Sequence, residues 1–396
     1  MRPLKIIFIL LITCFLAQSC TEAYPLLTNT YEEAIVVEAT LTNELKYQEI
    51  KINKTSKFED KDTQKESNAH VFVTDDSGNQ YDFQEDTEKY VSKVEFQAVS
   101  GRKYQLHITT ADGRSFASSP EILTAINPIE SVKAAVEKDN NDQRGVSIRV
   151  NSFDAKNESK YYRYEYEETY KVVAPKWVPT KVVSYSGNTF VYGPNATDIR
   201  ICYGDKKSTD IILTQTNNLS EDRVDNFLLR FISDKDYIIT TRYSILVTQY
   251  IESFGAYSYY KTLKEMSGSE SILSPKQPGI LLGNLRAVDN SNSKILGYFD
   301  VASVSRERIY FNYDDFFLGE AAPPYYTNCD DFCYSISPFV PIPCTHESGG
   351  FDEDFNTHQI TYYIDRFDVG YLFWVNAPCG DCTTFASNIK PPFWID

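Results

Sequence analysis

Apolar and polar residues alternate along much of this sequence, which is the pattern of half-buried β-strands. Tyr47 to Ile52 and Tyr104 to Thr109 both alternate in this way. The second of these runs is followed by Asp112 and Gly113, a pair that favours a tight hairpin. A further turn sequence, Asp75 to Asn79, separates two more short apolar runs. Short strands at this spacing predict an immunoglobulin-like β-sandwich over residues 31–126.

A second, larger domain is predicted over residues 127–396, because Asn127 and Pro128 mark a boundary and strand-like runs continue beyond it. Tyr161 to Tyr166 is an aromatic strand. Ile295 to Val301 and Arg308 to Phe311 are interpreted as a pair of strands. The predicted fold class is therefore mostly all-β, with antiparallel sheets in both domains.

One or two short helices are expected within the larger domain. Apolar residues recur at helical spacing in one stretch, which favours a helix there, with an irregular strand as the alternative: Val224, Phe227, Leu228 and Phe231. A second helix is predicted from Tyr257 to Met266, ending at Gly268.

The first residues have the three parts of a secretory signal. A basic start (Arg2, Lys5) precedes an apolar run from Ile6 to Ala17, and small residues stand before Cys20. The apolar run is shorter than the roughly 20 residues needed to span a bilayer. The stretch before Cys20 resembles a bacterial lipobox, so residues 1–19 are interpreted as a lipoprotein signal peptide, Cys20 as the lipidated residue and residues 20–30 as a tether. The alternative is an ordinary secretory signal with an incidental cysteine.

Composition restricts the partners of the chain. The 55 acidic residues outnumber the 39 basic ones, which gives a formal net charge of −16. Nucleic-acid binding requires clustered Lys and Arg, so no nucleic-acid partner is expected. The 29 Tyr and 24 Phe residues agree with a β-rich chain, in which most aromatic rings pack in the core or across strands.

Six cysteines remain after Cys14 leaves with the signal and Cys20 takes the lipid. An even number in an exported chain favours disulfides, although the pairing cannot be deduced from the sequence. The alternative is a zinc site of four thiolates, built from the spaced pairs Cys329/Cys333 and Cys379/Cys382. A redox-active Cys379–Cys382 pair is a weaker alternative, because no thioredoxin-like pattern surrounds it. The disulfide candidates are Cys202, Cys329, Cys333, Cys344, Cys379 and Cys382.

No catalytic motif is evident. The four histidines form no H-E-x-x-H pair, and there is no G-x-S-x-G or P-loop motif. The acidic run Asp352 to Asn356 lacks the glycine and the final acid of a calcium loop and is interpreted as a solvated loop. The doublets Asp314-Asp315 and Asp330-Asp331 offer carboxylates, but neighbouring residues on a strand point to opposite faces. No catalytic residue, metal or cofactor is therefore predicted.

A set of motifs in a fixed order gives this chain a family resemblance. The motifs are Gly101 to Ile108 with Asp112-Gly113, Tyr161 to Tyr164, Arg242 to Gln249, Leu296 to Phe299, Cys379 to Cys382 and Lys390 to Trp394. Together they resemble the domain of unknown function 4249 (DUF4249) family of Bacteroidota outer-membrane lipoproteins. The resemblance implies a lipid anchor, an immunoglobulin-like module followed by a larger β-rich module, and association with a TonB-dependent outer-membrane transporter. It implies no catalytic residues.

These observations predict a lipoprotein of the outer membrane, on its cell-surface face or its periplasmic face, that acts as an accessory or ligand-capture subunit of a TonB-dependent transporter. A peptide or glycan ligand would be bound through exposed aromatic residues, for which the candidates are Tyr325, Tyr326 and Phe339. Two alternatives stay open: an extracytoplasmic hydrolase of glycans or peptides whose acids converge only in three dimensions, and a structural component of the cell envelope.

Overall fold

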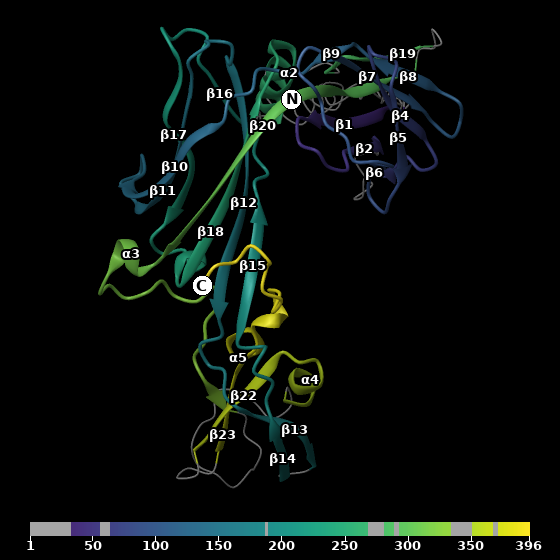
Figure 1. Cartoon of the computed structure of the whole chain (residues 1–396). Coiled ribbons are helices and arrows are strands. Elements are labelled where there is room, and N and C mark those ends of the chain that lie inside the picture. Colours follow the sequence, from purple (N-terminus) through teal and green to yellow (C-terminus); the bar gives the residue numbers. More distant parts are fainter. Residues whose placement is uncertain are drawn as a thin grey trace, which may run out of the picture.

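The computed structural model describes residues 33–55, 64–186, 189–267, 281–288, 293–333, 351–366 and 371–396. In these parts the chain is mostly strand, with a few short helices, which confirms the mostly all-β fold class. Figure 1 shows three regions: a sandwich at one end, a long central sheet that we call the trunk, and a small distal lobe at the other end. No helix of the described chain is both long enough and apolar enough to cross a bilayer.

The sandwich is built from short antiparallel strands around a core of aliphatic and aromatic side chains. Its strands are β1 (Ile35–Thr42), β2 (Glu49–Lys54), β3 (Gln64–Lys65), β4 (His70–Asp75), β5 (Gln80–Glu85), β6 (Tyr90–Ser92), β7 (Lys103–Thr109), β8 (Ser115–Ser118), β9 (Glu121–Ile122) and β19 (Leu285–Ala287). Gly78 and Gly113 have φ of +87° and +89°, as the predicted hairpin turns require. The core also contains Leu285, Ile295 and Phe299, so this region is completed by a segment far along the chain.

The trunk consists of two packed sheets. One sheet has the order β15-β12-β18-β20, with β16 paired to β12, and the other has the order β10-β11-β17. Their bounds are β10 (Ile129–Lys138), β11 (Arg144–Asp154), β12 (Tyr161–Val173), β15 (Ile201–Lys207), β16 (Ile212–Gln215), β17 (Asp222–Ser233), β18 (Arg242–Ile251) and β20 (Ile295–Asn312), with helical segments η1 (Tyr237–Ile239), α2 (Phe254–Ser267) and α3 (Asp314–Phe317). Tyr162, Tyr164 and Tyr243 are among the buried side chains between the sheets.

The distal lobe has its own small core around Trp374. Its elements are β13 (Thr180–Ser186), β14 (Thr189–Pro194), β21 (Phe332–Cys333), β22 (Ile360–Arg366), β23 (Tyr371–Asn376), α4 (Phe351–Asn356), α5 (Ala377–Gly380) and η3 (Cys382–Thr384). The acidic run from Asp352 to Asn356 therefore lies in a short helix, so its interpretation as a loop is wrong.

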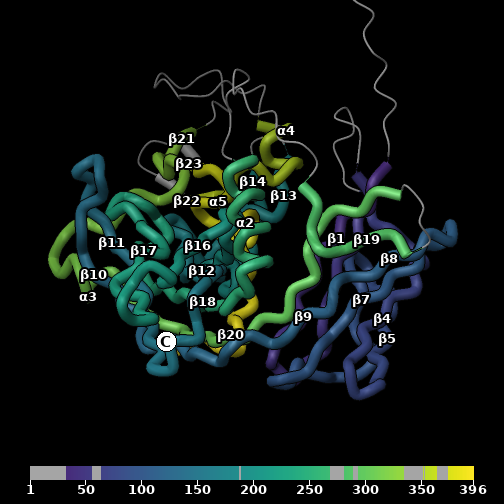
Figure 2. Tube along the Cα trace, turned by 90° about the horizontal axis from the view of Figure 1, so that it is seen from above, coloured from purple at the N-terminus to yellow at the C-terminus, as the bar shows by residue number. Residues whose placement is uncertain are grey.

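Strand β20 joins the sandwich to the trunk. Its first part, Ile295 to Ala302, pairs in parallel with β1. Its second part, Ser303 to Asn312, pairs antiparallel with β18. The prediction of two separate strands in this stretch is wrong, because one continuous strand of 18 residues belongs to both regions. Viewed from above, in Figure 2, the sandwich strands gather on one side, the trunk lies on the other, and β20 runs between them.

The prediction of a helix at Val224 to Phe231 is also wrong, because these residues lie in β17. The pairing of β17 with β11 contains two register shifts, and Asn226 has a φ of +49°. These bulges interrupt the two-residue alternation of the strand, so the apolar residues acquire a spacing that imitates a helix. The predicted helix from Tyr257 to Met266 is confirmed as part of α2.

Candidate binding surface

Two disulfides fasten the last part of the chain to the trunk and the distal lobe. Cys202 of β15 is bonded to Cys382 of η3, and Cys329 is bonded to Cys379 of α5. Cys333 is also disulfide-bonded, and Cys344 lies outside the described residues. The prediction of disulfides is confirmed for these two pairs.

The alternatives for the same cysteines are wrong. Cys379 and Cys382 are bonded to different partners and not to each other, so they do not form a redox pair. The four cysteines of the proposed zinc site are all disulfide-bonded, so none of them offers a free thiolate to a metal ion. The described residues also hold no cluster of three or more metal-ligating side chains.

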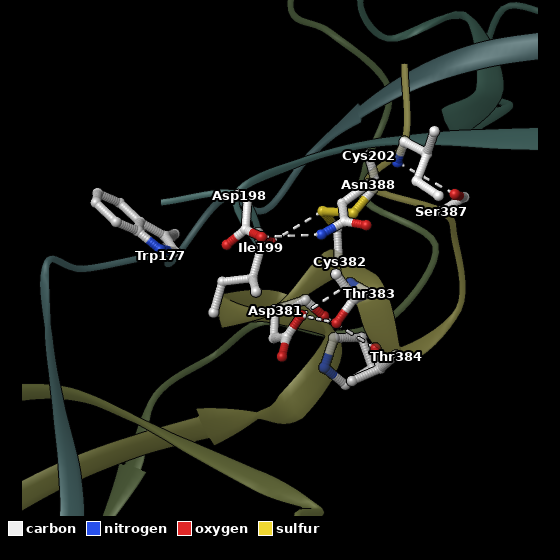
Figure 3. The surroundings of a disulfide bond; sticks show 12 residues. Trp177, Asp198, Ile199, Cys202, Asp381, Cys382, Thr383, Thr384, Ser387 and Asn388 are labelled. Atoms are coloured by element: carbon white, nitrogen blue, oxygen red, sulfur yellow. Dashed lines mark hydrogen bonds between the residues drawn. A yellow bond between two sulfur atoms is a disulfide. The ribbon is translucent and has the colours of Figure 1, made fainter. Parts of the chain in front are cut away.

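Hydrogen bonds reinforce the Cys202–Cys382 connection, as Figure 3 shows. The amide nitrogen of Cys382 donates to the carbonyl oxygen of Ile199 at 2.9 Å. Tyr203 and Ser387 exchange two backbone hydrogen bonds, of 2.7 and 3.2 Å. The segment that begins at Cys382 is therefore fixed along the edge of β15. We call this fixed segment the base.

Five aromatic side chains meet beside this base, and we call them the aromatic cluster: Tyr170, Tyr237, Tyr325, Tyr326 and Phe385. The rings of Tyr326 and Phe385 have centroids 4.3 Å apart, and those of Tyr237 and Tyr326 are 5.5 Å apart. Tyr170 meets Tyr237 edge-on at 5.7 Å. The members come from β12, η1, the segment after α3 and the segment after η3, so only the tertiary structure brings them together.

Exposure differs within the aromatic cluster. Tyr170 is buried, Tyr237, Tyr325 and Phe385 are half-buried, and Tyr326 is 41 % exposed. The structure therefore brings the predicted contact residues Tyr325 and Tyr326 together and presents mainly the second one to solvent. Phe339, the third predicted contact residue, lies outside the described residues.

Hydrogen bonds hold the hydroxyl groups of three tyrosines in the cluster. The hydroxyl of Tyr325 donates to the carbonyl oxygen of Pro378 at 3.0 Å, and the hydroxyls of Tyr170 and Tyr237 are 3.2 Å apart. Burial raises the pKa of Tyr170 and of Tyr325 above the usual value. These groups therefore remain protonated at neutral pH and serve as hydrogen-bond donors.

In each acidic doublet, one carboxylate accepts a hydrogen bond from a neighbouring residue. Asp314 and Asp315 lie in the first turn of α3 and not on a strand, which corrects the sequence interpretation. The Oδ2 atom of Asp315 accepts a hydrogen bond from the amide nitrogen of Asn312 at 2.7 Å, so this carboxylate stabilises the start of the helix. Oδ2 of Asp330 accepts from the side-chain amide of Asn328 at 3.0 Å.

The chemistry that the aromatic cluster offers is therefore contact through ring faces and edges. Such surfaces bind flat or apolar groups, including aromatic and proline side chains and the apolar faces of sugars. Sequence reasoning missed Tyr170, Tyr237 and Phe385, because nothing in their local pattern separates them from the many aromatic residues of the core.

Comparison with known families gives one match. The family described as Domain of unknown function (DUF4249) matches residues 21–308, which includes Tyr170 and Tyr237 but ends before Tyr325. No curated protein matches this chain.

Proposed function

The chain belongs to the DUF4249 family, and from that premise we propose that it is an outer-membrane lipoprotein that binds a ligand or partner without turnover, as an accessory subunit of a TonB-dependent transporter. The leader and Cys20 support the lipid anchor, and the family resemblance supports the transporter partner. The acid-rich composition suits a body that stands away from an anionic membrane surface.

The observation that carries the binding role is the aromatic cluster. An exposed tyrosine ring that rests on a second ring, above a base fixed by a disulfide, is already ordered before any partner arrives. Ordered aromatic side chains lose little conformational freedom on binding, and such residues often dominate the binding energy of an interface. Tyr326 is the member of the cluster best placed to contribute in this way.

The arrangement of the regions supports the same role. The predicted tether leads into β1 of the sandwich, and the sandwich lies at the opposite end of the molecule from the distal lobe (Figure 1). The aromatic cluster belongs to the trunk and its C-terminal additions. A lipid anchor at Cys20 would therefore hold the sandwich near the membrane and leave the cluster accessible to a partner.

The proposal is tested by pull-down of the full-length lipoprotein from outer membranes in mild detergent. We expect a TonB-dependent transporter to be recovered with the wild type and to be reduced at least about tenfold with Tyr326→Ala, since a central aromatic residue of an interface contributes about 2 kcal/mol or more. Tyr47→Ala is the matched control, because Tyr47 is an exposed tyrosine on the sandwich. Recovery of no transporter with the wild type, or equal losses with both variants, would contradict the proposal.

The anchor and its side of the membrane require separate measurements. Cys20→Ser is expected to abolish acyl labelling and to release the protein from the membrane fraction. Protease treatment of intact cells is expected to remove the protein if it faces the cell surface. An acyl label that survives in Cys20→Ser would show that the anchor lies elsewhere.

A further inference from the structure

A buried group of charged side chains lies where β20 passes from the sandwich to the trunk, at a position that we call the joint (Asp300 to Ser303). Asp300 is 1 % exposed and is paired in register with Thr40 of β1. Glu252 is also buried and directly follows β18. The next residue, Ser253, stands at the start of α2, where its side chain accepts a hydrogen bond from the amide of Ala256. The two carboxyl groups thus come from the two sides of the joint.

The hydrogen bonding of this carboxyl pair is incomplete. In the described chain, both carboxylate oxygens of Asp300 lack a hydrogen-bond donor. The Oε2 atom of Glu252 lacks one as well. Arg163 of β12 donates from Nε to Oε1 of Glu252 at 2.6 Å, and its Nη1 atom donates to Oε1 of Glu165. Because this guanidinium already pairs with Glu252 and Glu165, it cannot also neutralise a charged Asp300. An unpaired charge in a buried site is strongly disfavoured.

A proton between Asp300 and Glu252 supplies the missing donor. The two side chains are close enough to hydrogen-bond, and burial together with the charge of Glu252 raises the pKa of Asp300 well above its usual value. Burial lowers the pKa of Arg163, but Glu252, Tyr260, Glu165 and Tyr250 together raise it further, so the net shift of this pKa is upward. The pair therefore carries one negative charge, which the guanidinium of Arg163 balances.

Helix α2 closes this site. The ring of Tyr260 in α2 lies 4.6 Å from the Arg163 guanidinium, whose other face is covered by Tyr250 at 4.0 Å. Tyr257 of α2 packs on Tyr161 of β12 at 4.9 Å, and Tyr259 of α2 packs on Tyr298 of β20 at 5.5 Å. The helix thus bridges the trunk and the strand that the sandwich shares, directly over the carboxyl pair.

The titratable and charged groups that act on Asp300 come from every neighbouring element. Those that interact with Asp300 itself are Arg163 of β12, Glu252 before α2, Tyr260 of α2, Tyr298 of β20 and Glu121 of β9. Glu165 of β12 and Tyr250 of β18 act on Arg163. Arg163 is the one cation among them. Arg306 acts on Tyr250, at the outer side of this group. Loss of the shared proton therefore adds a negative charge that Arg163, already paired with Glu252 and Glu165, does not balance.

We propose that the proton shared by Asp300 and Glu252 is a latch: while it is bound, α2 stays closed over the joint, and when it leaves to solvent at alkaline pH, α2 and the joint open. Opening lets water reach the two carboxylates and relieves their repulsion. The latch couples the local pH to the rigidity of the connection between the sandwich and the trunk. This inference does not depend on the proposed binding role.

The experiment is hydrogen exchange of the full mature chain between about pH 6 and about pH 10, with protection factors corrected for intrinsic exchange. In the wild type we expect the protection of α2 to fall by up to about tenfold per pH unit while the closed form keeps the proton and the open form has lost it, and to level off once the closed form has also released it, as linkage to one proton requires. Asp300→Asn supplies a permanent amide donor to Glu252, so its α2 protection should stay constant over the same range.

The control is Asp154→Asn. Asp154 is another buried carboxylate, but it accepts hydrogen bonds from the amides of Lys156, Glu158 and Ser159, so its negative charge is already stabilised by donors. This variant should keep the alkaline loss of α2 protection even if its overall stability is lower. If Asp300→Asn fails to fold, infrared spectroscopy of the wild type decides, since a shared proton requires a protonated-carboxyl band at neutral pH. Absence of that band, α2 protection in the wild type that does not change with pH, or the same pH response in Asp300→Asn, would overturn the latch.

Discussion

The guanidinium of Arg308 lies 3.6 Å from the ring centroid of Phe393, so a side chain of β20 holds the end of the chain against the trunk. Two hydrogen bonds extend this contact: Tyr310 donates to the carbonyl oxygen of Phe393, and Arg242 donates to that of Ile395, both at 2.5 Å. The last residues of the chain therefore form a strap over the sheet (defined here as residues 389–396), where the ring of Trp394 also meets Tyr203 at 5.1 Å.

The strap predicts a measurable effect of Phe393→Ala. Loss of the cation–π contact and of the ring burial should lower the free energy of unfolding of the trunk by about 1 kcal/mol, because the ring is still partly exposed. Urea denaturation followed by tryptophan fluorescence measures it. Ile389→Ala in the same strap removes a side chain that is 75 % exposed and should change stability by less than about 0.5 kcal/mol. Equal effects of the two substitutions would show that the Arg308 contact contributes nothing.

The stability lost when a disulfide is removed should increase with the length of the loop that it closes. Cys202 and Cys382 are 180 residues apart, whereas Cys329 and Cys379 are 50 residues apart. The chain-entropy model predicts that Cys202→Ser/Cys382→Ser destabilises the protein by about 1 kcal/mol more than Cys329→Ser/Cys379→Ser. Guanidinium denaturation of the two double variants tests this difference. A larger loss of stability in Cys329→Ser/Cys379→Ser would show that this disulfide stabilises the protein mainly through local packing in the distal lobe.

Gly297 is expected to tolerate no side chain. Its φ is +117°, and a Cβ atom there would lie 2.0 Å from the carbonyl oxygen of Val37, so the parallel pairing of β1 and β20 would have to separate. Gly297→Ala should cost more than about 3 kcal/mol, which is the upper end for backbone strain alone.

Gly319 is the matched control for this substitution. Its φ is +79°, but no atom lies within 4 Å of a Cβ placed there, so Gly319→Ala should cost only about 1 kcal/mol of left-handed strain. Thermal unfolding followed by circular dichroism compares the two variants. Similar melting temperatures would show that the pairing of β1 and β20 accommodates the added side chain at little cost in stability.

Acid should weaken the hairpin between β7 and β8. Hydrogen bonds from Arg114 and then Thr110 lower the pKa of Asp112 to about 2 from the ordinary 3.8. A carboxyl whose pKa is lowered by folding stabilises the native state above its unfolded pKa, and this contribution is lost as the pH falls from about 4 towards about 2. Because Asp112 is exposed, the effect should be at most about 1 kcal/mol.

The measurement for Asp112 is a carboxyl-carbon NMR titration combined with the pH dependence of stability. Asp112→Asn should remove the contribution of Asp112 to the acid dependence of the sandwich's stability and leave that of Asp75 and Glu85, whose pKa values are also lowered. The fold at neutral pH should stay intact. A titration midpoint near 3.8 for Asp112 would show that the bonds with Arg114 and Thr110 are not formed in solution.

Local patterns predicted the elements whose determinants are close together in the chain. The turns at Gly78 and Gly113 and the helix from Tyr257 to Met266 depend on neighbouring residues, and each appears in the structure. The even number of cysteines left after the predicted leader and anchor likewise predicted disulfides, because that inference depends on the expected compartment and not on the geometry.

Elements that depend on distant partners were beyond such reasoning. The bulges that give β17 its helical spacing arise from its pairing with β11, and β20 is continuous because β1 and β18 supply successive partners for one strand. The aromatic cluster gathers Tyr170, Tyr237 and Phe385 from separate segments, so no local signal marks them.

The amino-acid order alone was enough to indicate an acidic β protein and to predict its export and its disulfides, since composition and short-range alternation report burial and turn formation directly. Only the folded chain decided which cysteines are bonded, which aromatic rings reach solvent and that Asp300 and Glu252 meet at the joint. The physical reason is that these features depend on pairing between strands separated by tens to hundreds of residues, and hydrophobic periodicity carries no record of the partner.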